Sequence, residues 1–177
     1  MPWDEDVFAM LDELEHRAEA VYDRERLPEL ADRGRAEYAS VTLASRLMAS
    51  VDCDVVLDVQ GVGSVEGRLR RVAAEWCLLR GPGQDWVVRT DAVRVLRGLS
   101  DRSVPEVAWS PLARLGFASA LRRLADRGER CVVRLRDGAA HDVVLRRVGA
   151  DFVEADEGSG RLLVAFDAVA AVQSRDA

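Results

Sequence analysis

The sequence predicts a mainly β protein with helices (α+β), built from two tandem, strongly curved five-stranded barrels that are each preceded by a helix. Three observations predict this fold class. A segment repeats at a fixed offset, apolar and polar residues alternate with period two, and short turns separate the alternating runs. With 177 residues, of which 49% are hydrophobic, the chain is long and apolar enough for two small folded domains.

The internal repeat is the strongest of these observations. Residues 69–76 (LRRVAAEW) match residues 145–152 (LRRVGADF), and 91–93 (DAV) match 167–169 (DAV). Both matches have the same offset, because position 69 maps onto 145 by the shift that maps 91 onto 167. Two matches at this one repeat offset indicate an internal duplication.

Each copy predicts five strands joined by short turns. From Cys53 to Val59 and from Arg130 to Arg136, apolar residues alternate with polar or charged ones, which is typical of a half-buried strand. Asp137 and Gly138 then provide a hairpin turn. The remaining strands are expected at about 65–72, 76–79, 86–89 and 93–96 in the first copy and at 140–148, 152–155, 162–165 and 169–172 in the second.

Helices are expected before each copy and at the N-terminus. Ser110 and Pro111 are a good helix start, and apolar residues recur at helical spacing between Leu30 and Met48. The apolar stripe of the helix before the second copy would be Leu112, Leu115, Leu121 and Leu124. The predicted organisation is an acidic N-terminal helix at 1–28, a helix and barrel at 29–97, a linker at 98–109, and a helix and barrel at 110–174.

Charge is distributed unevenly along the chain. The net charge is −6, all 25 basic residues are arginine, and residues 1–50 carry 12 acids against 6 arginines. The chain therefore lacks the broad basic surface expected of a nucleic-acid-binding protein. No apolar run approaches the roughly 18 residues that span a membrane, and the acidic start lacks the pattern of a secretory signal. We expect a cytoplasmic protein without membrane association, in which Cys53, Cys77 and Cys131 are buried thiols.

The order of motifs in each copy points to a known family. The second copy has an alternating strand and glycine turn at 131–138, a further strand pair around 145–152 and a final aliphatic strand at 168–172, and the first copy adds Gly67 on its second strand. This layout resembles the Sm-like proteins, small SH3-like barrels that include a bacterial RNA chaperone. The resemblance covers about two thirds of the chain and is carried mostly by barrel geometry. The whole chain is also similar to uncharacterised two-repeat proteins of GC-rich bacteria.

The resemblance implies that RNA would bind through two loops, one at the start of strand three and one before strand five. In the first copy these loops read Glu75 to Cys77 and Arg89 to Asp91. In the second they read Asp151 to Val153 and Ala165 to Asp167. Neither copy keeps the polar and basic residues of the family at these positions, so the resemblance implies the fold and not RNA binding by the usual pocket.

An arginine cluster in the second copy is the best candidate for contacts with nucleic acid. On the predicted strand, Arg130, Arg134 and Arg136 would share one face, which could meet phosphates. Asp126, Glu129 and Asp137 interleave with the cluster, so a mixed, salt-bridged face is at least as good an interpretation. The cluster consists of Arg122, Arg123, Arg127, Arg130, Arg134 and Arg136.

Two arginine pairs recur in both copies, Arg70 with Arg71 and Arg146 with Arg147. They could form two related anion-binding patches. The interpretation that we favour is that they solvate the end of strand two and pair with Glu75 or Asp151, because surface ion pairing is the usual role of arginine.

Aromatic and apolar residues outside the predicted barrels are the other candidate contacts. Trp76 and Trp86 fall on core positions, whereas Trp3 and Trp109 lie outside the barrels and are freer to meet a partner. The N-terminal helix would present a docking face of Val7, Phe8, Leu11 and Leu14.

No catalytic, cofactor or metal motif appears in the sequence. His16 and His141 lack ligands at metal spacing, and there is no phosphate-binding loop, dinucleotide fingerprint or nucleophile elbow. We therefore expect a non-enzymatic protein-interaction or scaffolding module, without cofactor, whose exposed edge strands pair with a protein partner or with another copy. The alternative is an RNA-binding protein that uses the arginine cluster, and a third hypothesis is small-molecule or anion sensing between the barrels.

Overall fold

The computed structural model describes residues 13, 14, 16, 17, 32, 34–158 and 160–175, which divide into two units. The first unit is Met1–Val41 and the second is Thr42–Ala177, so both repeats lie in one unit. In the first unit, residues 34–39 and the other described positions from 13 to 32 are helical. Of the predicted docking face, Leu14 is exposed, and Val7, Phe8 and Leu11 lie outside the described residues, as do Trp3 and much of the expected N-terminal helix.

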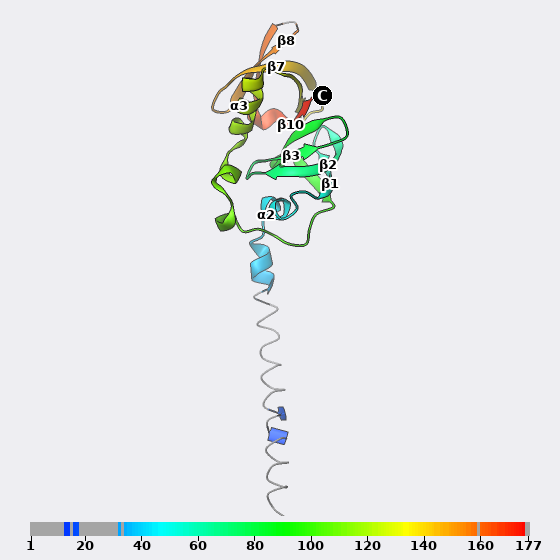
Figure 1. The fold of residues 1–177 in the computed structure, drawn as a ribbon, viewed down its shortest axis with the longest axis vertical. Coiled ribbons are helices and arrows are strands. Elements are labelled where there is room, and N and C mark those ends of the chain that lie inside the picture. The colour runs from blue at the N-terminus through cyan, green and yellow to red at the C-terminus, as the bar shows by residue number, and fades with distance from the viewer. Residues whose placement is uncertain (1–12, 15, 18–31, 33, 159, 176–177) are drawn as a thin grey trace, which may run out of the picture. The chain divides into compact units, whose positions relative to one another are not determined.

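The described residues of the second unit form ten strands and two α-helices (Figure 1). The helices are α2 (Leu43–Met48) and α3 (Phe117–Arg127). The strands of the first repeat are β1 (Asp54–Val59), β2 (Gly63–Val72), β3 (Trp76–Arg80), β4 (Asp85–Arg89) and β5 (Val93–Arg97). Those of the second repeat are β6 (Arg130–Leu135), β7 (Ala140–Val148), β8 (Phe152–Glu157), β9 (Gly160–Ala165) and β10 (Val169–Ser174).

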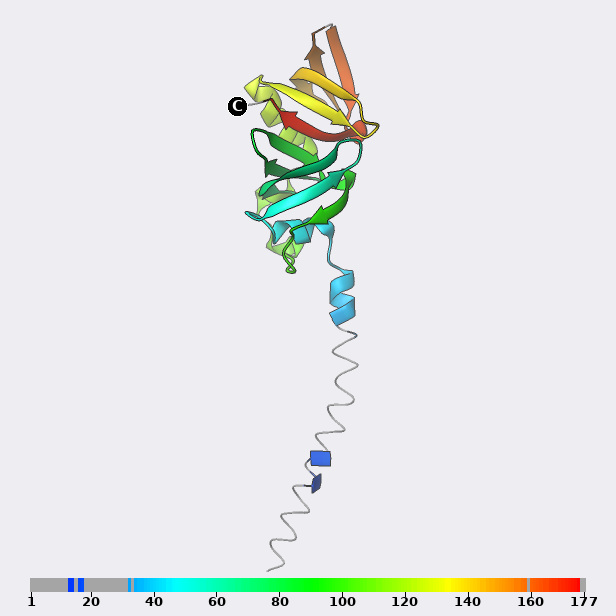
Figure 2. The same cartoon turned by 90° about the vertical axis from the view of Figure 1, so that its right-hand side faces the viewer.

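All ten strands form one open antiparallel sheet in the order β5-β1-β2-β3-β4-β10-β6-β7-β8-β9. The prediction of two separate five-stranded barrels is therefore wrong. The final strand of the second repeat pairs with β6 of its own repeat on one side and with β4 of the first repeat on the other. Figure 2 shows β10, in red, lying between the strands of the two repeats. Because β4 of the first repeat pairs with β10 of the second, the backbone hydrogen bonds of the sheet continue from one repeat into the other.

The helices also differ from the prediction. The helix expected between Leu30 and Met48 is interrupted at Ser40 and Val41, and α2 covers only its last six residues, starting with a capping box between Thr42 and Ser45. Before the second repeat, Pro111–Arg114 forms a 3-10 turn, η3, and α3 begins after Gly116. The interruption leaves Leu112 and Leu115 exposed, whereas the prediction placed them on the buried stripe of one longer helix.

A contact from the first repeat starts α3. The backbone N–H of Phe117 donates to Oε2 of Glu75, in the β2–β3 turn, at 2.8 Å. This carboxylate satisfies one of the free N–H groups at the helix N-terminus and interacts well with its positive end. The other end of α3 stops at Gly128, whose φ of 64° is the left-handed conformation typical of a helix C-cap.

The core consists of two clusters, and each contains side chains from both repeats. The larger one surrounds Phe117 and Leu145 in the second repeat but includes Trp76 and Val87 of the first. The other surrounds Leu57 and Leu69 and includes Ala170 and Ala171 of β10. Strand β10 therefore helps to bury apolar surface of both repeats, which favours their folding as one unit. Among the described residues, no helix combines the length and apolar character needed to cross a membrane.

Candidate functional site

The junction between the repeats is held by short main-chain pairing and by side-chain contacts at both ends. Strands β4 and β10 pair in the register Val88 with Ala171, Val87 with Val172 and Trp86 with Gln173. At one end, Asp91 accepts from Arg89 at 2.5 Å and from Arg136 of the second repeat at 2.6 Å. Partial burial would raise the pKa of Asp91, but the hydrogen bonds and positive charges of the two arginines outweigh this effect and lower it below its ordinary value.

At the other end, amide and hydroxyl groups join the β3–β4 turn to β10. Arg134 donates to Oε1 of Gln173 at 3.2 Å, and the Gln173 amide in turn bonds to Oε1 of Gln84. The backbone N–H of Asp85 donates to Oγ of Ser174 at 2.8 Å. These contacts hold the β3–β4 turn against the C-terminal end of β10.

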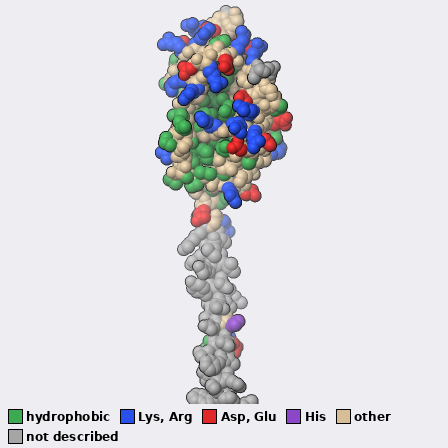
Figure 3. Space-filling model, viewed as in Figure 1, with side chains coloured by type: hydrophobic (Ala, Val, Ile, Leu, Met, Phe, Trp, Pro, Cys, Tyr) green, Lys and Arg blue, Asp and Glu red, His purple; other side chains and the backbone are tan. Residues whose placement is uncertain are grey.

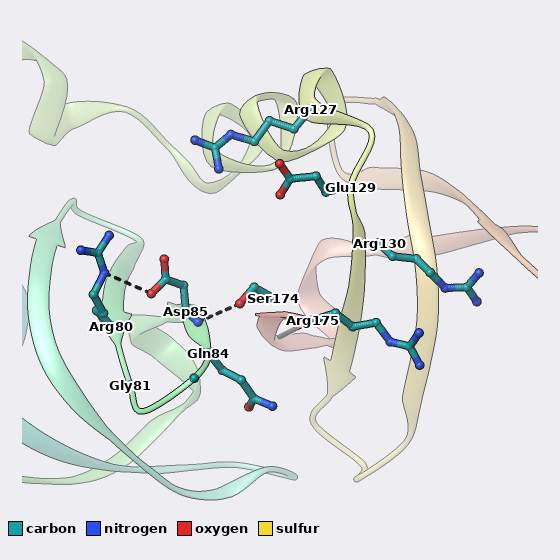
Figure 4. A pocket seen from close by; sticks show the side chains of 10 residues that line it. Arg80, Gly81, Gln84, Asp85, Arg127, Glu129, Arg130, Ser174 and Arg175 are labelled. Carbon is teal, nitrogen blue, oxygen red and sulfur yellow. Dashed lines mark hydrogen bonds and ion pairs between the residues drawn. The ribbon is translucent and has the colours of Figure 1, made fainter. Parts of the chain in front are cut away.

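A groove of about 810 Å³ opens beside these contacts (Figure 4). One wall is the β3–β4 turn of the first repeat, and the other is formed by the end of α3, the start of β6 and the end of β10. Figure 4 shows Arg127 extending from the end of α3 toward the wall that carries Arg80. The lining residues are Arg80, Gly81, Gly83, Gln84, Asp85, Arg127, Glu129, Arg130, Ser174 and Arg175.

The arginines of the groove differ in how they are paired. Arg130 and Arg175 both contact Asp142, at 3.0 and 2.6 Å, and Arg80 lies 3.5 Å from Asp85. Arg127 makes no ion pair or hydrogen bond with the described residues. The sequence did not single out Arg80 and Arg175, because only the pairing of β10 with β4 brings them to the same groove.

The predicted arginine cluster does not form one surface. Arg122 and Arg123 are exposed on α3, and Arg127 and Arg130 line the groove. Arg134 and Arg136 instead contact Gln173 and Asp91 within the junction. Figure 3 shows arginine and carboxylate side chains interspersed over the face in view, next to a stretch of apolar side chains. The charged surface on the face in view is thus mixed.

The two recurring arginine pairs each contribute one ion pair. Arg70 contacts Asp52 at 2.5 Å, and Arg146 contacts Asp156 at 2.7 Å. Hydrogen bonds and charge attraction from Arg146 and Arg161 lower the pKa of Asp156. Neither pair uses Glu75 or Asp151 as we expected, since Glu75 caps α3. Arg71 and Arg147 are exposed and make no ion pair within the described part of the chain.

The two outer strands of the sheet, β5 and β9, each have one unpaired edge. Both expose large apolar side chains, with 41% of Val95 and 65% of Leu163 accessible to solvent. No other described strand of the sheet lacks a neighbour on one side. These edges are the places where another strand could hydrogen-bond to the protein.

Other residues singled out in the sequence are structural. Trp109 is buried and donates from Nε1 to the carbonyl of Val104 at 2.8 Å, so the prediction that it is free to meet a partner is wrong. Trp76 is buried as expected. Burial raises the pKa of the Cys77 thiol to about 12 and, together with the charge of Asp142, that of Cys131 to about 11, whereas Cys53 is half-buried.

The described residues contain no cluster of three His, Cys, Asp or Glu side chains that could hold a metal ion. In comparisons with known proteins, no family model and no curated protein matches this chain.

Proposed function

We propose that this chain is a non-enzymatic protein-interaction module of the cytoplasm, and that it binds by strand addition at the open edges of its sheet. The first partner that we propose is a second copy of the chain, joined head to tail through β9 of one copy and β5 of the next. The observation that supports this is the β4–β10 junction, in which the protein already makes such a pairing with itself.

The repeat relates the open edges to the junction. At the repeat offset, β9 is equivalent to β4, and β5 is equivalent to β10. The same register would place Val95 opposite Val164, Leu96 opposite Leu163 and Arg97 opposite Leu162. In the junction the corresponding side chains Val88, Val87 and Val172 are buried. Pairing would therefore bury Val95 and Leu163, the two large exposed apolar side chains of the edge strands, and satisfy unpaired backbone groups.

Charge on the edges limits the strength of this contact. Arg94 and Arg97 lie on β5, and Arg161 lies on β9, so the two edges carry charges of the same sign. Arg94 is partly neutralised by Asp58 at 2.9 Å, and Arg161 by Asp156 at 3.4 Å. Arginines on an edge strand are a common device against indiscriminate pairing. We therefore expect a reversible, concentration-dependent association that strengthens with salt as the repulsion is screened.

Light scattering on full-length protein with one edge altered at a time tests the proposal. Val95→Arg blocks β5 and Leu163→Arg blocks β9, and each variant alone should be monomeric where the wild type is larger. An equimolar mixture of the two should form a dimer, because the first variant keeps β9 and the second keeps β5. Val107→Arg, at a side chain that is 87% exposed away from the edges, is the matched control and should behave as wild type.

Each outcome has a distinct meaning. If Val95→Arg still self-associates and Leu163→Arg does not, the contact is β9 with β9 and the head-to-tail pairing is wrong. If the wild type stays monomeric at millimolar concentration, self-association is wrong, and capture of a strand-forming peptide at the edges becomes the test of the broader proposal. Heterologous pairing gives rings or filaments, so the wild type should exceed the mass of a dimer.

RNA binding through the arginines of the second repeat is the alternative proposal. It has less support, because two of the six arginines are engaged in the junction and the remaining ones are divided between α3 and the groove. The same purification separates the two proposals. RNA that copurifies and is released by salt would favour the alternative, since phosphate contacts weaken with salt whereas the edge pairing strengthens.

A further inference from the structure

We propose that the groove at the junction binds a small ligand that carries a phosphate or diphosphate group. This inference is independent of the sheet edges and goes beyond a protein-interaction function. The groove exists only because β10 brings the second repeat against the β3–β4 turn of the first, so its walls come from both repeats.

The size of the groove fits a ligand larger than a bare ion. Its volume of about 810 Å³ lies within the range of roughly 300–1,000 Å³ typical of small-molecule sites. Gly81 and Gly83 lie on one wall and present backbone without side chains. The room therefore suits a nucleotide-sized molecule whose phosphate end lies between the two walls.

The groove offers donors that the protein itself does not use fully. Arg127 has no partner among the described residues, and Arg80 has only a 3.5 Å contact with Asp85 at the exposed surface. Such surface pairs contribute roughly 0–1 kcal/mol, so Arg80 can turn to another anion at little cost. Oγ of Ser174 accepts a hydrogen bond from Asp85, and its own hydroxyl proton has no acceptor within the described chain. Guanidinium forks and hydroxyl donors are the groups that recognise phosphate.

The charge of the lining, together with Asp142 beside it, is slightly positive and favours an anion. Four arginines line the groove, against the carboxylates of Asp85 and Glu129. Arg130 and Arg175 share the single carboxylate of Asp142 and so leave one positive charge uncompensated. Arg80 and Arg127 come from opposite walls of the groove, so they are the arginines that we expect to donate to the ligand.

The arginine on the first repeat's wall of the groove has no basic equivalent in the second repeat. At the repeat offset, Arg80 corresponds to Asp156 and Gly81 to Glu157, so the equivalent turn in the second repeat is acidic. Glu129 and Arg130 follow α3, which leads into the second repeat. Arginines on two facing walls are thus found at the junction, beside the β3–β4 turn, and not beside the equivalent β8–β9 turn.

Isothermal titration of the full chain with pyrophosphate, inorganic phosphate, ADP and adenosine tests this inference. Pyrophosphate and ADP should bind and adenosine should not, and tighter binding of ADP than pyrophosphate would identify a nucleotide as the better ligand. Arg127→Gln should weaken binding about tenfold or more, the loss expected for a charge-assisted hydrogen bond. Arg122→Gln, on the same helix but outside the groove, should bind as wild type.

Two results would overturn the inference. One is the absence of pyrophosphate and ADP binding at millimolar concentration. The other is an equal loss of affinity in Arg122→Gln and Arg127→Gln, which would indicate nonspecific attraction to arginine. Leu163→Arg should keep full affinity, so the inference stands or falls separately from self-association.

Discussion

Phe117→Ala should destabilise both repeats together, although the residue lies in the helix that leads into the second. Its side chain is 1% exposed, and its ring packs edge-on against Phe166 with centroids 5.7 Å apart. The guanidinium of Arg89, from the first repeat, lies 5.2 Å from the ring centroid. Truncating a buried phenylalanine costs about 3–5 kcal/mol, and loss of the aromatic and cation–π contacts places this one near 5 kcal/mol.

Urea unfolding followed by two signals measures this effect. Trp86 packs against the core around Leu57, whereas Trp76 belongs to the core around Phe117. In a Trp76→Phe background, tryptophan fluorescence therefore reports mainly on the first repeat, while circular dichroism reports on the whole sheet. Both signals should shift to the same lower midpoint, and the melting temperature should fall by roughly 10–20 °C. Val107→Ala, at an exposed position, should change stability by less than about 0.5 kcal/mol. A fluorescence midpoint that stays at the wild-type value while the circular dichroism midpoint falls would refute the idea of one cooperative unit.

Two further predictions concern the junction, and both are read from urea midpoints. Gly61→Ala should lower the free energy of unfolding by several kcal/mol, because the φ of Gly61 is +73° and a Cβ there would lie 2.6 Å from the carbonyl carbon of Arg136. The control Gly63→Ala, at φ +93° with open space around it, should lower it by only about 1–2 kcal/mol, the cost of the left-handed backbone. Equal losses in the two variants would mean that the close approach to Arg136 is not maintained. Asp91→Asn should cost about 1 kcal/mol at neutral pH. Since the folded-state pKa of Asp91 is lowered, this stability is fully present above the unfolded-state pKa of about 4 and is lost as the pH falls through the folded value. The wild type and the variant should therefore converge in acid, and a constant difference down to the lowest pH would contradict the role of its charge.

The strands were predictable because their signal is local. Period-two alternation placed strands at 53–59, where β1 runs from Asp54 to Val59, and at 130–136, where β6 runs from Arg130 to Leu135. The repeat offset carried each strand of the first repeat onto its equivalent in the second. Alternation depends only on residues that are close in the sequence, and the repeat offset depends only on the duplication. Neither depends on which strands pair with each other in the sheet.

The junction was not predictable for the same reason. The pairing of β10 with β4 joins residues that are far apart in the sequence, such as Val88 and Ala171, and either strand could equally have stayed at an edge. The roles of Arg134 and Arg136 follow from that pairing, since alternation gave their strand face but not the neighbouring Gln173 and Asp91. Trp109 was assigned to a free linker because no alternating pattern surrounds it, yet it is buried with its Nε1 bonded to Val104.

The position of β10 has a consequence for how the chain folds during synthesis. It is the last of the ten strands to leave the ribosome, yet it lies in the middle of the sheet and is buried along nearly its whole length. Until it is added, β4 and β6 both retain open edges next to apolar surface. A nascent chain that stalls before Val169 would therefore expose two strands prone to aggregation, and the addition of β10 completes both halves of the sheet at once.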